Sequence, residues 1–458
     1  MEKKDIDLIL EEQRLFFNAG STLDIDFRIN ALKKLRTLIL EYKPMLLDAL
    51  WKDFHKPAAE SVSSEVHFVL KELNYTLRNL RRWAAPERHR TPIVHFPASS
   101  FVIPQPYGQV LIISPWNFPV QLALVPLLGA IAAGNCAILK VSRQVPETSR
   151  VLEMILGAMD RKHMAIIQGD HQVSEQLLNY KFDYIFFTGG QETGRHVMTK
   201  AAANLTPVSL ELGGKNPCII AADAKLDFAV NRIAWGKFFN GGQTCVAPDY
   251  ILIDETIRDK FIEMLGKKLL EFYGNDPESS PDFARVINPA RAEHLASLMQ
   301  NGRVVTGGET DISKCYVAPT VICDVNPGDP VMREEVFGPI MPVLTFKKID
   351  EIYSIIERNQ KPLALYIFTR NSRLASEVLS RTRSGSSAVN DTVVQFASPY
   401  LPFGGVGTSG IGKYHGRNTF KTFSNMRSLM VKSNLLDIFL RYPPYTSFRK
   451  KVLELLMR

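Results

Sequence analysis

A series of short apolar segments between residues 108 and 189 restricts the fold more than any other feature of the sequence. The four segments have the length of β-strands and lie at 110–113, 136–139, 165–167 and 184–187. Segments of helical character separate them. Strands that are apolar on both faces and linked by helices form a parallel sheet, so we expect an open α/β fold. Such sheets bind ligands at the carboxyl ends of their strands.

Helical patterns precede this region, and a second α/β region follows it. Residues 24–83 carry apolar residues at helical spacing, with Pro44 and Ser61 at the expected starts of two helices. Residues 86–106 are interrupted by prolines and contain β-like runs at 93–96 and 101–103, which is typical of a hairpin that leaves the main body. Beyond Glu211 we expect helices at 258–272 and 373–382 and strands near residues 304, 317 and 364.

Length and composition are those of a globular protein with two or three domains. The chain has 458 residues, of which 45% are apolar and 22% charged. Its formal charge of +8 is scattered along the sequence rather than gathered in a stripe with aromatic residues, which argues against nucleic-acid binding. Five cysteines without a CxxC pair indicate neither a zinc site nor a disulfide framework. We therefore expect a reducing, cytoplasmic compartment.

The sequence favours neither membrane insertion nor secretion. Residues 115–139 contain no charged residue and are long enough to span a bilayer. Their prolines, glycines and amide side chains divide the stretch into a helix-like and a strand-like part, so we expect a buried helix followed by a buried strand. Acidic residues at Glu2, Asp5 and Asp7 stand where a signal peptide would have its apolar run.

One cysteine has neighbours that suit a nucleophile. Cys245 follows Gly241 and Gly242, which allow a sharp turn and the close approach of another molecule. A strand-like run at 250–253 comes directly after it. A lone cysteine is more often a small buried hydrophobic residue than a nucleophile, so the assignment depends on residues elsewhere in the chain.

Two further stretches carry polar groups that catalysis by a thiol requires. Glu211 lies in an apolar run before two glycines, and burial there would raise its pKa toward that of a base at neutral pH. The alternative is a glutamate at a sheet edge that faces water. Asn117 follows the first parallel strand and could donate a hydrogen bond to a developing oxyanion. By itself, a turn-forming asparagine is the simpler interpretation.

A glycine-rich turn follows the fourth apolar segment. Thr188, Gly189, Gly190 and Gly194 stand where a strand gives way to a helix. Free backbone N–H groups and the helix N-terminus suit a pyrophosphate there, although the pattern is not GxGxxG. A plain tight turn explains the same glycines about equally well.

Six motifs in a fixed order make the sequence similar to the aldehyde dehydrogenase superfamily over nearly its whole length. They are PWNFP at 115–119, FTG at 187–189, LELGGK at 210–215, GQTC at 242–245, EVFGP at 335–339 and PFGG at 402–405. The short N-terminus and the runs 245–250 and 414–416 resemble the class 3 branch. The resemblance implies a Rossmann-like cofactor domain, an α/β catalytic domain and a small β oligomerisation extension. It also implies a homodimer that oxidises aromatic or medium to long aliphatic aldehydes.

The resemblance assigns catalytic roles to three residues. Cys245 would attack the aldehyde carbon, while the Asn117 amide and the Cys245 backbone N–H hold the oxyanion. Glu211 would activate the water that hydrolyses the thioester left after hydride transfer to NAD or NADP. Three phenylalanines suggest an apolar mouth for the aldehyde: Phe118, Phe239 and Phe396.

For the cofactor, the resemblance implies that Glu335 holds the nicotinamide ribose, Phe337 packs beside the ring and Lys140 reaches the adenosine ribose. Arg143 departs from the family pattern, which usually has a glutamate there to accept a hydrogen bond from that ribose. Arginine removes the acceptor and supplies a fork that suits phosphate, so the sequence favours NADP over NAD. The alternative is that Arg143 points into solvent.

The predicted function is the oxidation of an aldehyde to a carboxylic acid. An acylating enzyme that passes the acyl group to a thiol such as coenzyme A is one alternative, and Glu211 argues against it because that route needs no water-activating base. A catalytically silent cofactor-binding protein is another. The intact set of Cys245, Glu211 and Asn117 argues against a silent protein.

The expected domains use separate parts of the chain. We expect a cofactor-binding domain from 1–85 and 107–209, a catalytic domain at 210–388, oligomerisation or bridging segments at 86–106 and 389–426, and a tail at 427–458. The tail ends in a predicted amphipathic helix with an apolar stripe made of Phe448, Val452, Leu455 and Leu456. A helix docked on the body is the simpler interpretation. The alternative is a cap over the substrate entrance that also contacts anionic membrane surfaces.

Overall fold

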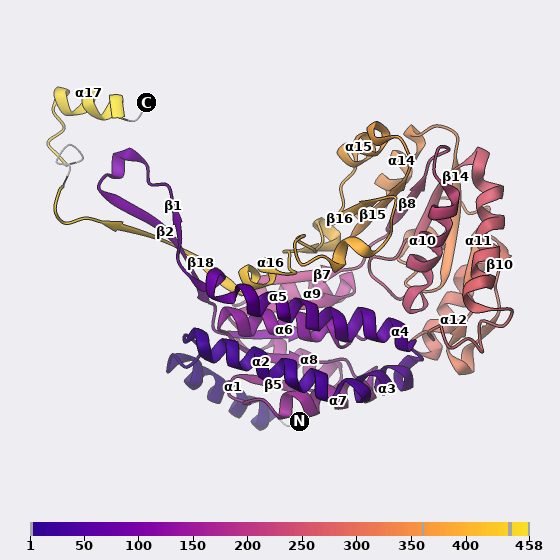
Figure 1. Ribbon diagram of the computed structural model, residues 1–458, viewed down its shortest axis with the longest axis horizontal. Coiled ribbons are helices and arrows are strands. Elements are labelled where there is room, and N and C mark those ends of the chain that lie inside the picture. Colours follow the sequence, from indigo (N-terminus) through magenta and orange to yellow (C-terminus); the bar gives the residue numbers. More distant parts are fainter. Residues whose placement is uncertain (1–2, 360, 438–441, 457–458) are drawn as a thin grey trace.

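Two sheets with helices on their faces make up the body of the protein, and a narrow three-stranded sheet extends from it (Figure 1). The computed structural model describes residues 3–359, 361–437 and 442–456. The arrangement confirms the predicted α/β fold with a small β extension. Among the described residues, no helix combines the length and apolar character needed to cross a membrane.

The first sheet has six strands in the order β17-β7-β6-β3-β4-β5. Its strands are β3 (Gln109–Ile113), β4 (Cys136–Lys140), β5 (Met164–Ile167), β6 (Tyr184–Gly189), β7 (Val208–Leu212) and β17 (Gly410–Ile411). All pair in parallel except β17, which runs antiparallel to β7. The four apolar segments of the sequence are thus parallel strands. Because the strand order reverses around β3, a ligand crevice is expected at its carboxyl end.

Helices from the N-terminal half cover this sheet (Figure 1). They are α1 (Lys3–Asn18), α2 (Ile25–Glu41), α3 (Lys43–Phe54), α4 (Ala58–Glu60), the π-helix Ser61–Val66, α5 (His67–Ala84), α6 (Gln121–Ala133), α7 (Pro146–Gly157), α8 (His171–Leu178) and α9 (Gln191–Ala202). The uncharged stretch is the fully buried helix α6 followed by the buried strand β4, as predicted. Helix α1 was not predicted. Its Ile6, Ile9 and Leu10 pack in the core beside Leu111 and Ile138.

The second sheet has seven strands in the order β10-β13-β14-β9-β8-β15-β16. They are β8 (Pro217–Ile220), β9 (Tyr250–Asp254), β10 (Arg303–Thr306), β13 (Thr320–Cys323), β14 (Ile340–Phe346), β15 (Ala364–Phe368) and β16 (Ser386–Val389), and β11 (Thr310–Asp311) pairs with β12 (Tyr316–Val317) alongside. The helices are α10 (Leu226–Phe238), α11 (Arg258–Tyr273), α12 (Pro289–Leu298), α13 (Pro330–Arg333), α14 (Asp350–Arg358) and α15 (Ser372–Arg381). The helices and strands predicted in this region are confirmed to within about two residues.

The extension is a sheet in the order β1-β2-β18 that projects from the body (Figure 1). It consists of β1 (Glu87–His89), β2 (Ala98–Pro106) and β18 (Ser424–Lys432). The predicted hairpin is confirmed, but the run 93–96 is wrong as a strand, because Ile93–His95 is a 3-10 helix that follows Pro92. Strand β18 was not predicted, since it is mostly exposed and its sequence lacks an alternation of apolar and polar residues.

The tail of the chain differs from the expectation of a helix docked on the body. Helix α16 (Arg417–Thr422) leads into β18, and α17 (Ser447–Leu456) lies beyond the extension, away from both large sheets (Figure 1). The interpretation of α17 as docked on the body is therefore wrong, and Phe448 and Leu455 are exposed. The division into domains stays a prediction; β7 ends at Leu212 and β18 at Lys432, past the expected boundaries at 209 and 426.

Candidate active site

A cavity of about 340 Å³ brings together most of the residues that the sequence singled out. Its lining includes Asn117, Thr188, Gly189, Gly190, Glu211, Cys245, Glu335 and Phe337. The residues come from the carboxyl ends of β3, β6 and β7 and from loops of the second sheet. A larger cavity of about 750 Å³ lies beside α14. It contains none of these groups, so we place the site by its chemistry rather than by its size.

Cys245 sits on a loop whose backbone only certain residues can adopt. Asn240, Gly241 and Gly242 have φ values of 56°, 60° and 72°, all in the left-handed region. A Cβ on Gly242 would lie 2.2 Å from the carbonyl oxygen of Gly338, so no larger residue fits there. The loop leaves Cys245 half-buried at the cavity wall. Three of the other four cysteines are buried in the hydrophobic cores.

Glu211 is the nearest acid to this sulfur. Cys245 Sγ donates to Glu211 Oε1 over 3.7 Å, while Tyr414 Oη and Thr188 Oγ1 donate to Glu211 Oε2 over 2.8 and 3.3 Å. Glu211 is 4% exposed, and its backbone pairs with Gly410 of the edge strand β17. The buried position predicted for Glu211 is confirmed, and the water-facing alternative is wrong.

Burial sets the protonation of the pair. It raises the pKa of Glu211 to about 7, although the hydrogen bonds from Tyr414, Thr188 and Cys245 oppose the shift. Burial also raises the pKa of Cys245 well above its ordinary value, and the nearby carboxyls of Glu211 and Glu335 raise it further. The resting sulfur is therefore a thiol, and Glu211 is placed to accept its proton.

The Asn117 side chain is tied to the cysteine loop. Asn117 Nδ2 donates to the carbonyl of Gln243 over 3.1 Å, and Asn240 Nδ2 donates to the carbonyl of Asn117 over 3.0 Å. Gln243 in turn donates to Asn240 O and accepts from the Ile287 N–H. The sequence analysis did not single out Asn240 and Gln243. Two amide side chains so close to Cys245 could have indicated that they hold the loop in place.

The other side of the cavity is lined by Gly213, by the acid Glu335 and by an aromatic pair. A Cβ on Gly213 would lie 1.8 Å from Glu335 Oε2, so the carboxyl lies directly over the glycine. Burial raises the pKa of Glu335 to about 8, against the charge of Arg291, which also lines the cavity and was missed. Phe337 and Trp116 meet edge to face at 5.5 Å.

Not all predicted cofactor residues line this cavity. Lys140 ends β4 and donates from Nζ to the carbonyl of Val141 over 2.8 Å, and burial lowers its pKa to about 8. The charge of Arg143, which is exposed, lowers the pKa of Lys140 as well, so the two cations are neighbours. A Cβ on Gly194 would lie 2.6 Å from Leu212, so this glycine serves the packing of α9 on β7.

A second, narrow cavity of about 10 Å³ also has Cys245 in its wall. Four of its lining residues are aromatic, namely Phe118, Phe396, Phe403 and Tyr414, and Glu211 and Cys245 line it as well. Phe239 stacks on Phe118 at 6.0 Å but does not line this cavity. Cys245, Glu211 and Leu122 line both cavities.

Comparisons with known proteins agree with this geometry. Residues 1–429 match the pattern that defines the Aldehyde dehydrogenase family. The chain is 44% identical to aldehyde dehydrogenase family 3 member B1 of Rattus norvegicus over 98% of this chain and 96% of that protein. It is 41% identical to 4,4'-diaponeurosporen-aldehyde dehydrogenase of Staphylococcus aureus over 95% of each chain.

The fold of the whole chain has a solved counterpart. The substrate-bound structure of Staphylococcus aureus AldH superimposes with a TM-score of 0.97 over 99% of each chain, at 39% identity. Its similarity includes the strands and loops that carry the candidate site, because nearly every residue is covered. The chain therefore belongs to the aldehyde dehydrogenase family and is an oxidoreductase that acts on aldehydes.

Proposed function

We propose that the protein oxidises an aldehyde to a carboxylic acid through a covalent bond to Cys245, with NAD or NADP as the oxidant. The observation that carries this proposal is the contact of 3.7 Å between Cys245 Sγ and Glu211 Oε1, in the wall shared by two cavities. The larger cavity suits the nicotinamide, and the aromatic residues of the narrow one, which has room for about one water molecule, would border the aldehyde.

The first step is attack by the sulfur on the carbonyl carbon. Glu211 takes the thiol proton, the new carbon–sulfur bond forms, and the carbonyl π electrons move to the oxygen. The Asn117 amide has two N–H donors, and the Gln243 carbonyl occupies only one of them. The other donor and the Cys245 backbone N–H can hold the oxyanion. Fixed donors of this kind lower the barrier by about 3 kcal/mol each.

The residues of the larger cavity fit a nicotinamide cofactor. Gly213 leaves room for the Glu335 carboxyl, which an added Cβ would strike, and Gly190 opens α9 with free space beside it. Glu335 would hold the nicotinamide ribose, Phe337 would border the ring, and Thr188, Gly189 and Gly190 would lie beside the pyrophosphate. When bound, the cofactor supplies the acceptor for the hydride that leaves the substrate carbon. Lys140 and Arg143 would hold the adenosine ribose, and Arg143 favours NADP.

The second step is hydrolysis of the thioester on Cys245. Tyr414 and Thr188 hold one oxygen of Glu211, which keeps the other oxygen beside the sulfur. Glu211 first releases the thiol proton to solvent, and its pKa of about 7 then lets the carboxylate remove a proton from a water molecule near neutral pH. Transfer to a thiol such as coenzyme A would not need this base, so hydrolysis is the preferred route.

The aldehyde side of the site favours an apolar substrate. Four of the side chains there are aromatic, and Glu211 is the only carboxylate among those lining that cavity in the described part of the chain. We therefore propose aromatic or medium to long aliphatic aldehydes as substrates.

We also propose that the protein is a cytoplasmic homodimer. The open edge of β18, where Met430 and Val431 are exposed, supports the dimer.

Cys245→Ala tests the proposed function. The variant should lose the increase in absorbance at 340 nm with benzaldehyde and either cofactor, yet still bind the cofactor. Cys315→Ala is a matched control because Cys315 is also half-buried but lies outside both cavities. Activity above a few per cent in Cys245→Ala would exclude the covalent route.

A further inference from the structure

Two buried charged side chains and a half-buried one lie next to the proposed site without lining either cavity. Lys56, Glu60 and Glu65 flank or belong to the π-helix Ser61–Val66 that leads into α5. The side chains of Lys56 and Glu65 have no exposed surface, and Lys56 Nζ lies 2.7 Å from Glu65 Oε1. A buried ion pair is often no more stabilising than apolar residues of the same volume. What these charges hold in place is therefore informative.

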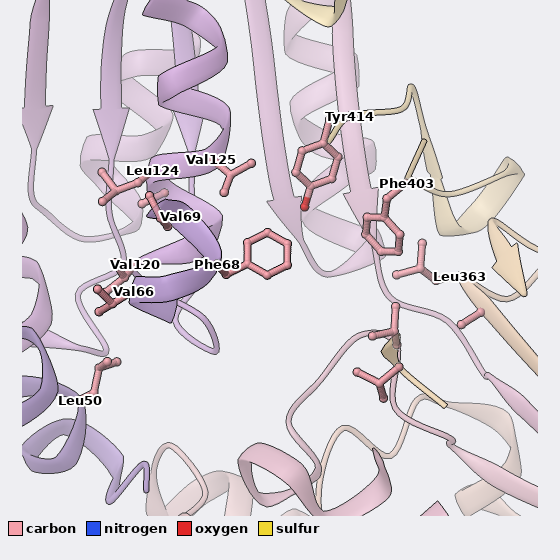
Figure 2. Close-up of a cluster of buried hydrophobic side chains, with 14 of the residues drawn as sticks. Leu50, Val66, Phe68, Val69, Val120, Leu124, Val125, Leu363, Phe403 and Tyr414 are labelled. Carbon is pink, nitrogen blue, oxygen red and sulfur yellow. The ribbon is translucent and has the colours of Figure 1, made fainter. Parts of the chain in front are cut away.

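Glu65 holds the start of the helix that follows Asn117. Its Oε2 accepts the backbone N–H groups of Val120 and Gln121 over 3.1 and 2.8 Å. A carboxylate at this position also stabilises the positive end of the α6 dipole. Figure 2 shows Val66, the next residue along the chain, beside Val120. The loop that carries Asn117 is thus anchored at its C-terminal end.

Glu60 holds the loop that carries the nucleophile. Its Oε2 accepts the backbone N–H of Asn240 over 2.9 Å. Asn240 is the first of the three left-handed residues that lead to Cys245. A non-glycine residue in this conformation costs free energy unless its surroundings hold it. Glu60 supplies one of the contacts that do so.

Lys56 connects the two carboxylates and touches the aldehyde side. The charges of Lys56 and Glu60 attract each other, as do those of Lys56 and Glu65. Lys56 Nζ also lies 3.9 Å from the centre of the Phe118 ring, which lines the narrow cavity. The Lys56 ammonium group therefore contacts Glu65, which holds the Asn117 loop, and is attracted to Glu60, which holds the Cys245 loop. It also contacts the wall of the narrow cavity.

The π-helix explains how two acids five positions apart can serve neighbouring loops. In an α-helix, residues five apart point about 140° away from each other, since each residue turns by about 100°. In a π-helix, hydrogen bonds join residues five apart, as the His67 N–H does with the carbonyl of Val62. Glu60 and Glu65 are therefore turned toward the same side, where Lys56 lies.

We propose that Lys56, Glu60 and Glu65 form a clamp that fixes the separation of Asn117 and Cys245. They are positioning residues, because none of them lines the cavities. The proposal rests on the proposed function, in which these two residues must act on the same carbonyl group. A displacement of about 1 Å at such a site can cost about a hundredfold in rate.

Paired variants at Glu60 test the clamp. Glu60→Ala removes the acceptor for the Asn240 N–H, and kcat should fall about 10- to 100-fold, with the KM for cofactor unchanged. Alkylation of Cys245 by iodoacetamide should slow in the same variant. Glu60→Gln keeps an acceptor oxygen and should restore most of the lost kcat. A general loss of folding would not produce this split between kcat and KM or this rescue.

Asp53→Ala is the matched control. Asp53 also accepts two backbone N–H groups at the start of a helix, those of Glu147 and Thr148 at 3.1 and 2.8 Å, but it anchors α7 rather than a catalytic loop. The Asp53→Ala variant should have a lower melting temperature than the wild type, but alkylation of its Cys245 should not be slower. If Glu60→Ala kept a kcat within about twofold of Asp53→Ala, the clamp would be excluded.

Two further measurements keep the test decisive. If Glu60→Ala does not fold, Glu60→Asp keeps the charge and shifts the acceptor by one methylene; an unchanged kcat there would also exclude the clamp. Wild-type activity together with an inactive Cys245→Ala shows that the proposed function stands even if the clamp fails. Activity in Cys245→Ala would instead remove the proposed function itself.

Discussion

Replacing Tyr414 with phenylalanine isolates one of the hydrogen bonds that tune the base Glu211. Tyr414 Oη donates to Glu211 Oε2 over 2.8 Å in a fully buried setting. This hydrogen bond stabilises the carboxylate and so opposes the effect of burial on its pKa. Tyr414→Phe keeps the ring that packs on Phe186 and Phe403. The variant should therefore raise the pKa of Glu211 above about 7 while leaving the packing intact.

The size of the shift follows from the strength of the lost bond. A hydrogen bond to a charged group is worth roughly 1.5–3 kcal/mol, and one pKa unit corresponds to about 1.4 kcal/mol. The pKa of Glu211 should rise by roughly one to two units. At pH 7 the ionised fraction would fall from about a half to between about a tenth and a hundredth. We expect kcat at pH 7 to fall roughly 5- to 50-fold and to recover at higher pH.

The assay is the pH dependence of kcat from pH 5.5 to 9.5 at saturating aldehyde and cofactor. Tyr184→Phe is the control, because Tyr184 is a buried tyrosine on the neighbouring strand β6 whose hydroxyl bonds to Ser209 at 2.6 Å. It makes no hydrogen bond to Glu211. The midpoint of the control should match that of the wild type. A midpoint that stays in place in Tyr414→Phe would refute the reasoning, since the base would then titrate independently of this bond.

Three further predictions concern the cofactor, the tail and stability. Arg143→Glu should reverse the ratio of kcat/KM for NADP over NAD through KM, by roughly 10- to 100-fold; a wild type that prefers NAD, or an unmoved ratio, would contradict the role of Arg143. Removing residues 443–458 should affect the KM for long aldehydes and for benzaldehyde alike, because α17 lies away from both large sheets (Figure 1); a larger change for long aldehydes would show that α17 caps an entrance. Burial raises the pKa of Glu72 to about 7, so its contribution to stability is complete below about pH 4.5 and is lost as pH rises through 7. Glu72→Gln, which keeps an acceptor for the Gly416 N–H, should reduce the fall in melting temperature between pH 5 and 8, and an unchanged pH dependence would argue against this titration.

The sequence predicted those parts of the fold and site that depend on local patterns. Apolar runs identified β3, β4, β5 and β6, because strands buried on both faces need apolar residues throughout. Glycines marked the loop before Cys245, because φ values near 60° favour glycine. The apolar neighbours of Glu211 predicted its burial correctly.

Contacts between distant parts of the chain could not be predicted in this way. Tyr414 reaches Glu211 from more than two hundred positions away, and Arg291 enters the cavity from α12. Glu60 and Asn240 meet only because the N-terminal helices fold over the second sheet's loops. Strand β18 is mostly exposed, so its sequence lacks the alternation that would identify it.

The placement of Cys245 between two cavities has a consequence for how such an enzyme can diversify. Among the residues that the structure describes, only Cys245, Glu211 and Leu122 line both spaces. Two of these are the reacting groups of the proposed mechanism, so every other lining residue belongs to one side alone. Substitutions at Phe396 or Phe403 can reshape the aldehyde side while the Glu335 side keeps its lining, and the reverse holds for Trp116 or Phe337. Substrate range and cofactor choice are thus separable traits, open to selection or engineering one at a time.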